Sequence, residues 1–173
     1  MKFKKFYYKK VNSTNDTALK HISKGHERGI IVADYQNKGK GQRGKNWISL
    51  KGNLFISLFF QIEKKLSLKK ITKLNTSIIK ECLKKFINYK IKIKLPNDIL
   101  INNQKICGIL QETIFARHKK FLVVGIGINI NKSPKIENYP TNFINFFTKK
   151  NVKRLDLIKK ISNVYEKKIG KFN

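Results

Sequence analysis

The stretch GKGQRGKNW at residues 39–47 holds three of the chain's ten glycines and ends on its only tryptophan. Glycine lets a ligand approach the backbone closely. Successive backbone N–H groups together with Lys40, Arg43 and Lys45 suit a phosphate or a carboxylate. Trp47 offers a face on which a flat ring could stack. On its own, the stretch is explained equally well by a solvated basic loop.

Two familiar phosphate-binding motifs do not fit this stretch. In a P-loop the Gly-Lys pair is followed by Ser or Thr, whereas Gly44-Lys45 is followed by Asn46. Gly39, Gly41 and Gly44 have the spacing of a dinucleotide-binding fingerprint, but they do not open a Rossmann helix. The glycines therefore predict a ligand-covering loop of another kind, which we expect to become ordered when a phosphate is present.

Polar residues also gather where strands are expected to end. Lys94 precedes Pro96, and a proline biases the residue before it toward extended geometry, so Lys94 should sit at a strand end. Asn97 and Asp98 follow, and Asn129 ends a later apolar run. Each of these residues also has an ordinary structural explanation. Lys94 would be an exposed strand lysine, Asn97 and Asp98 turn formers, and Asn129 a strand-end cap.

The hydrophobic pattern indicates the elements that would position these residues. Helical spacing predicts helices from Ser13 or Thr14 to about Lys24, over residues 67–89 and over 154–169. Strands are expected over residues 30–34, 54–62, 91–95 and 121–129, with two more in 99–112 around a turn at Asn102-Asn103. The expected fold class is α+β, with a mostly antiparallel mixed sheet flanked by helices.

Composition limits the class of protein. The net charge of +29 attracts polyanions, yet the lysines are spread along the whole chain, which favours a codon bias over a nucleic-acid-binding surface. Cys82 and Cys107 are expected to be core residues in a reducing cytoplasm, and the three histidines lack metal-ligand spacing. The N-terminus has no signal-peptide pattern, and no apolar run is long enough to span a bilayer.

Five motifs in a fixed order carry a resemblance to a known family. They are NSTND (12–16), DYQNKGKGQRGKNWIS (34–49), GNLFIS (52–57), KLPNDILINNQKICGIL (94–110) and VVGIGINI (123–130). Their order and spacing resemble the catalytic domain of biotin–protein ligases. The resemblance covers residues 8–145 and implies the fold shared with class II aminoacyl-tRNA synthetases. It also implies ATP-dependent biotinylation of a biotin carboxyl carrier protein through biotinyl-5′-AMP, with ATP, Mg²⁺ and biotin bound.

The resemblance also implies roles for single residues. Lys94 takes the place of the catalytic lysine, and Arg43 assists by holding the loop over the adenylate. Asn97 and Asp98 belong to the nucleotide site, Trp47 lies beside adenine and Asn129 lies near ATP. The residues implied to contact biotin or the adenylate phosphate are Ser13, Thr14, Asn15, Gln36, Gly39, Lys40, Gly41, Gln42, Lys45 and Gly108.

The chain departs from the family pattern at several places. Leu95 stands where the family has tryptophan, and Gln42 stands at the second basic position of the loop. We expect one catalytic domain over residues 1–173, without an N-terminal DNA-binding domain and without a C-terminal β-barrel. Sequence-specific nucleic acid and membranes are not expected partners, and a homodimer is left open. The alternatives are a lipoate or octanoate ligase of the same fold and a basic nucleic-acid-binding module.

Overall fold

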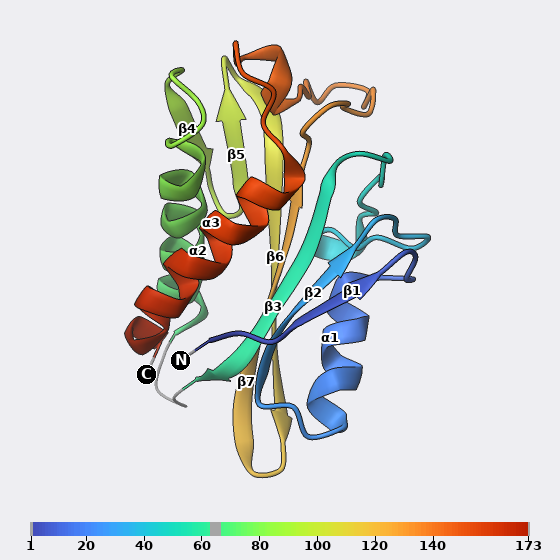
Figure 1. Ribbon diagram of the computed structural model, residues 1–173, viewed down its shortest axis with the longest axis vertical. Coiled ribbons are helices and arrows are strands. Elements are labelled where there is room, and N and C mark those ends of the chain that lie inside the picture. The colour runs from blue at the N-terminus through green and yellow to red at the C-terminus, as the bar shows by residue number, and fades with distance from the viewer. Residues whose placement is uncertain (1, 63–66, 173) are drawn as a thin grey trace.

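A computed structural model describes residues 2–62 and 67–172, and it contains one seven-stranded sheet with helices on both faces (Figure 1). The strands run in the order β1-β2-β3-β7-β6-β5-β4 across the sheet. They are β1 (Lys5–Tyr8), β2 (Arg28–Ala33), β3 (Leu54–Ile62), β4 (Ile91–Lys94), β5 (Asp98–Ile101), β6 (Gln104–Ala116) and β7 (Lys119–Ile128). The helices are α1 (Thr14–Ser23), α2 (Leu68–Leu83) and α3 (Arg154–Lys168).

The sheet is mixed, as expected. β1 pairs with β2 in parallel, and every other pair of neighbouring strands is antiparallel. β1 itself was not predicted from the sequence. Three of its four residues are aromatic, but the strand is short and lies at the edge of the sheet, where exposed and half-buried positions alternate. A run of four residues is too short to show a period.

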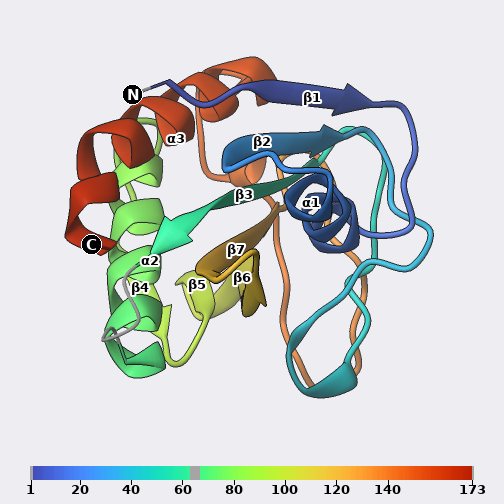
Figure 2. The same cartoon turned by 90° about the horizontal axis from the view of Figure 1, so that it is seen from below.

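Alternation along the strands divides the core between the two faces of the sheet. Ile30 and Val32 of β2 belong to the large cluster that packs against α2 and α3, whereas Ile31 belongs to a smaller cluster with Ala18 and Ile22 of α1. Figure 2 shows α2 and α3 together on one side of the sheet and α1 on the other. The α1 side has the smaller apolar cluster and leaves part of the sheet uncovered by a helix.

Local signals set most of the helix ends. The Ser13 side chain caps α1 by accepting a hydrogen bond from Asp16 N at 3.4 Å, and Gly25 follows the helix at φ +95°. α2 ends at Leu83, so the predicted extension to Tyr89 is wrong. Phe86, which suggested a longer helix, packs against the core together with Ile87 from the connection to β4.

Two tight turns fix the register of the long hairpins. Asn102 and Asn103 join β5 to β6 at φ +48° and +61°, in agreement with the predicted turn. Arg117 and His118 join β6 to β7 at φ +51° and +59°. β6 therefore continues to Ala116, four residues beyond the expected end at Glu112.

Both cysteines lie in the core, as predicted, and burial raises the pKa of the Cys82 thiol to about 12. Within residues 2–62 and 67–172, no helix has the length and apolar character needed to cross a membrane.

The two histidines near the end of α1 form a compact group with aromatic side chains. The rings of His21 and His26 are 4.9 Å apart, Phe6 lies 4.1 Å from His21, and the Tyr8 hydroxyl is 2.8 Å from His21 Nε2. Burial, and after it repulsion from His26, Lys24 and Lys4, lowers the pKa of His21 below its usual value. His21 therefore binds a proton less readily in the folded protein than in the unfolded chain.

This depressed pKa should make folding stability depend on pH. Near pH 6.5 the unfolded state binds more protons at His21 than the folded state does, so the free energy of unfolding should fall as pH drops below about 6.5. We expect His21→Gln to reduce this fall, measured by urea unfolding at about pH 5 and about pH 7.5. His118→Asn, at the exposed turn, is the control and should leave the fall unchanged. An equal pH dependence in His21→Gln and the wild type would contradict this assignment.

Candidate active site

Glycines open a cleft on the face of the sheet that α1 covers only in part. Phe121 and Val123 of β7 pack under α1, and by strand alternation the next residues on that face are Gly125 and Gly127. The opposite face of β7 carries Leu122, Val124, Ile126 and Ile128, which all lie in the large core. Beyond the start of α1, β7 therefore has no side chains on the face of the cleft, whereas its opposite face keeps its apolar side chains.

The resulting cleft has a volume of about 980 Å³. It is lined by nearly all the residues predicted for the site: Ser13, Thr14, Asn15, Gln36, Lys40, Gly41, Gln42, Arg43, Lys45, Trp47, Lys94, Asn97, Asp98, Gly108 and Asn129. Gly39 is not among the lining residues. It lies just behind them, where a Cβ would stand 2.5 Å from the Trp47 carbonyl oxygen. The fold thus brings together residues from four of the five motifs.

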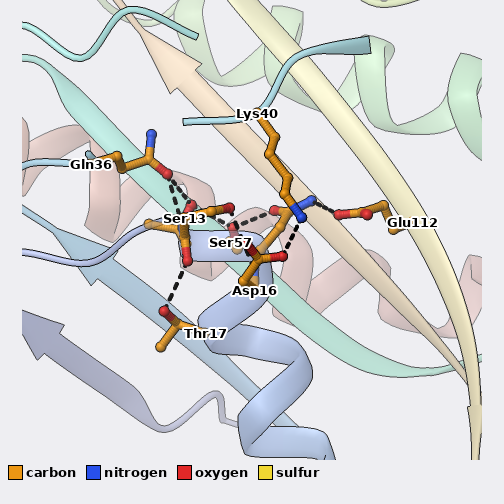
Figure 3. A network of polar contacts seen from close by, with 9 residues as sticks. Ser13, Asp16, Thr17, Gln36, Lys40, Ser57 and Glu112 are labelled. Carbon is orange, nitrogen blue, oxygen red and sulfur yellow. Dashed lines mark hydrogen bonds and ion pairs between the residues drawn. The ribbon is translucent and has the colours of Figure 1, made fainter. Parts of the chain in front are cut away.

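A buried polar network closes one end of the cleft, at the start of α1 (Figure 3). Ser57 Oγ lies 2.6 Å from Asn15 Oδ1 and 2.8 Å from Thr14 Oγ1. Asn15 Nδ2 donates to Glu112 Oε2 at 2.5 Å. Ser57 and Glu112 were not predicted, because neither one stands out from its strand in the sequence. Together these groups fix the Asn15 amide over Gly125.

Gln36 joins this network from the segment after β2. Its Oε1 accepts hydrogen bonds from Thr14 N at 2.9 Å and Thr14 Oγ1 at 3.1 Å, and its Nε2 donates to Ser49 Oγ at 3.2 Å. Gln36 and Ser49 are both buried. The Gln36 side chain therefore holds the start of α1 against the segment that leads into β3.

The segment 39–47 is a small hairpin over the cleft. Lys40 forms an antiparallel bridge with Asn46, Gly41 N donates to Lys45 O at 2.6 Å, and Trp47 N donates to Gly39 O at 2.8 Å. Arg43 and Gly44 form its tip at φ +55° and +74°. Whether ligands change the order of this hairpin stays a prediction.

An ion pair joins the hairpin to α1. Lys40 Nζ lies 2.5 Å from Asp16 Oδ1, and Figure 3 shows the lysine reaching down to the helix beside Glu112. The hydrogen bond to Asp16 raises the pKa of Lys40 above its usual value. Both side chains are substantially exposed, so the pair orients the loop more than it stabilises the fold.

Trp47 lies flat on the glycines of the sheet. A Cβ on Gly127 would stand 2.4 Å from Trp47 Cε2, and one on Gly108 would stand 2.7 Å from Trp47 Cζ3. The indole Nε1 is buried without a hydrogen-bond partner. That Trp47 lies beside adenine stays a prediction, but its contact with the bare backbone explains why glycine is needed at both positions.

A second lysine, which the sequence analysis did not single out, lies deeper in the cleft than Lys94. The Lys105 side chain is 18% exposed, and its Nζ lies 2.9 Å from Asp98 Oδ1. The same ammonium group is 5.3 Å from the centre of the Trp47 ring and 5.5 Å from that of Tyr139. Lys105 is therefore a cation held between two aromatic rings and one carboxylate.

Lys94 ends β4, as predicted, and is exposed at the mouth of the cleft. Its Nζ lies 4.5 Å from the centre of the Tyr139 ring. Its catalytic role stays a prediction. Asn129 is 1% exposed, and its Nδ2 donates to Asn142 O at 3.2 Å, so its side chain secures the chain after β7.

Comparison with known proteins places the chain in a family. A model of the biotin/lipoate A/B protein ligase family matches residues 7–129, a range that contains every predicted site residue. The chain belongs to this family. The match ends at Asn129, so the aromatic wall of the cleft at Tyr139 lies outside it.

Individual members of the ligase family give the same picture. The bifunctional ligase/repressor BirA of Escherichia coli is 33% identical over 123 residues, which are 69% of this chain and 38% of that protein. Biotin–protein ligase 2 of Arabidopsis thaliana is 36% identical over 132 residues, which are 72% of this chain and 40% of that protein. The chain thus spans about two fifths of the length of these relatives.

A solved structure of the ligase family extends the likeness to the whole fold. Biotin protein ligase from Aquifex aeolicus, in complex with biotin and ATP, superposes with a TM-score of 0.81 at 25% identity. The superposition covers 98% of this chain and 71% of that one. The expected fold class, a biotin ligase-like α+β domain with a mixed sheet, is confirmed.

Because Trp47 is the only tryptophan, its contact with Gly127 can be tested by fluorescence. A methyl group in Gly127→Ala would overlap the indole, so the ring should leave the sheet and its emission should shift to the red. We also expect faster trypsin cleavage after Lys40, Arg43 or Lys45. Gly170→Ala, where a Cβ meets no atom within 4 Å, should change neither property. Unchanged emission in Gly127→Ala would contradict this packing.

Proposed function

We propose that this chain attaches biotin to a lysine of a carrier protein in two steps, through biotinyl-5′-AMP. The proposal depends on one observation. The same cleft contains a network of hydrogen-bonding side chains at the start of α1 and the half-buried cation of Lys105. Two facts support it: the family match over residues 7–129, and the likeness to a ligase solved with biotin and ATP.

The two ends of the cleft suit different parts of the substrates. The network of Ser13, Thr14, Asn15 and Gln36 offers directional donors and acceptors for the polar rings of biotin. Its aliphatic tail would lie in the cleft, which Gly108 and Gly125 line. The tail would then lead toward Lys105, which suits the carboxylate and the α-phosphate of ATP. The hairpin 39–47 would cover this junction.

The chemistry needs charge neutralisation more than covalent catalysis. A carboxylate oxygen of biotin attacks the α-phosphorus of ATP, and the bond to pyrophosphate breaks. Negative charge on the α-phosphoryl oxygens is stabilised by the Lys105 ammonium, which the fold holds in place beforehand. The amine of the carrier lysine then attacks the mixed anhydride, loses a proton and displaces AMP. The hairpin must exclude water during this interval, because water would hydrolyse the adenylate.

Magnesium is part of the proposal as a companion of ATP. Among the described residues no three acidic, histidine or cysteine side chains form a metal cluster. A nucleotide-bound Mg²⁺ needs only one or two carboxylates, and Glu137 lines the cleft. Bound there, the ion would supply positive charge to the phosphate oxygens.

We propose that the acceptor is the biotin carboxyl carrier domain of a biotin-dependent carboxylase. A relative from Paracoccus denitrificans named biotin–[acetyl-CoA-carboxylase] ligase is 29% identical over 132 residues, which are 72% of this chain. A carrier lysine has to reach the adenylate from the open side of the cleft, beside Lys94 and Arg43. Both cations are exposed there.

The choice between biotin and lipoate can be tested directly. We expect a carrier domain incubated with the chain, ATP, Mg²⁺ and biotin to gain the mass of one biotinyl group, while lipoate on a lipoyl domain gives no product. Intact-mass spectrometry of both carriers provides the measurement. Transfer of lipoate in place of biotin would show that the chain is a lipoate ligase. No transfer of either would refute the proposed function.

The contributions of Lys94 and Lys105 to catalysis can be compared by matched substitutions. Lys105→Met keeps the stem but removes the half-buried charge, and we expect biotin-dependent pyrophosphate exchange to fall by roughly a hundredfold, as for one lost preorganised donor. Lys94→Met removes an exposed charge and should cost about tenfold or less. A larger loss in Lys94→Met than in Lys105→Met would support the predicted catalytic role of Lys94 and contradict the role proposed for Lys105.

A further inference from the structure

Tyr139 contacts both partners of the half-buried ion pair Lys105–Asp98 in the cleft. Its hydroxyl donates to Asp98 Oδ2 at 2.6 Å, while Lys105 Nζ lies 2.9 Å from Asp98 Oδ1. Burial, and after it the hydrogen bond to Asp98, raises the pKa of Tyr139, so the phenol keeps its proton as the donor. The two oxygens of one carboxylate are thus divided between a phenol and an ammonium group.

The segment that carries Tyr139 is attached to the backbone of Lys105 itself. Lys105 N donates to Pro140 O at 2.9 Å, and Asn142 N donates to Lys105 O at 3.0 Å. Thr141 forms a parallel bridge with Lys105, and its hydroxyl also donates to Pro134 O, which closes the loop on itself. The position of Tyr139 relative to Lys105 is therefore set by main-chain contacts.

We propose that Tyr139 is a positioning residue that acts through Asp98 to fix the ammonium group of Lys105 for adenylate formation. This inference rests on the proposed function. It assigns a role to a residue ten positions beyond the end of the family match at Asn129.

The physical reason lies in the freedom of a carboxylate. A carboxylate with one partner can turn about its last bond and carry an attached ammonium group with it. The Tyr139 hydroxyl holds Oδ2, so only Oδ1 faces Lys105. The side chains of Asp98 and Lys105 are 14% and 18% exposed, and little water is available to replace a lost partner. A displacement of about 1 Å at a catalytic group can cost on the order of a hundredfold in rate.

The ring of Tyr139 has a separate contact, which supplies an internal control. Lys94 Nζ lies 4.5 Å from the ring centre and makes no use of the hydroxyl. Tyr139→Phe keeps the ring for Lys94 and removes only the hydrogen bond to Asp98. The two lysines should therefore respond differently to the same substitution.

The test combines kinetics with chemical labelling. In Tyr139→Phe we expect kcat for biotin-dependent pyrophosphate exchange to fall by roughly tenfold, with KM for biotin changed by about twofold or less. Competitive acetylation with acetic anhydride, read by peptide mass spectrometry, should show faster labelling of Lys105 and unchanged labelling of Lys94. Tyr89→Phe, outside the cleft, is the matched control and should leave both measurements as in the wild type.

A cycle with Asp98→Asn tests whether the effect passes through Asp98. Once Asp98 is replaced, we expect Tyr139→Phe to lower kcat little further, because the effects of coupled residues are not additive. An unchanged kcat together with unchanged Lys105 labelling in Tyr139→Phe would overturn the inference, as would full additivity in the cycle. A wild-type chain without exchange activity would refute the proposed function instead, and the labelling would still report whether Tyr139 positions Lys105.

Discussion

The site depends on one steric constraint: the face of the sheet below the cleft must carry no side chains. Asn15 and Trp47 lie directly on the main chain of β7, where Cβ atoms on Gly125 and Gly127 would stand 2.3 and 2.4 Å from them. Gly108 on the neighbouring strand, β6, likewise has no side chain where the indole packs. This bare area lets a helix start and a hairpin approach the same backbone, and the ligand cleft lies between them. Core packing on the opposite face is untouched, because alternation separates the two faces.

Around this bare area the polar side chains are fixed by one another. Asn15 is held by Ser57 and Glu112, and Gln36 is held by Thr14 and Ser49. Buried polar groups that satisfy each other cost little to keep buried and lose little freedom when a ligand arrives. The same groups must exchange some of these hydrogen bonds for bonds to a ligand. The network therefore favours a ligand whose polar atoms match its donors and acceptors.

The sequence predicted the parts of the site that rest on local patterns. The capping serine, the Asn102-Asn103 turn and the continuous apolar runs of β3 and β7 are short-range signals, and they placed most of the elements correctly. Lys105 was missed because its importance is not local. Asp98 pairs with Gly108 and Leu100 pairs with Lys105, and the register of β5 and β6 shifts between Ile99 and Leu100. No spacing rule in the sequence reveals such a bulge. Tyr139 was missed because it lies in a loop without periodicity, and only the tertiary fold brings it to Asp98.

The distribution of acidic residues shows how a chain with 39 Lys and Arg against 10 Asp and Glu can still build a defined cationic site. Asp16, Asp98, Glu112 and Glu137, four of those ten acids, lie in or beside the cleft. The pairs Lys119–Glu27 and Arg154–Asp34 lie elsewhere and are more exposed than Lys105–Asp98, so they contribute less to position. Net charge alone attracts any polyanion without selecting a geometry. A cation acquires a fixed position only where an acid and neighbouring rings hold it, and in this cleft Asp98, Trp47 and Tyr139 provide that support to Lys105.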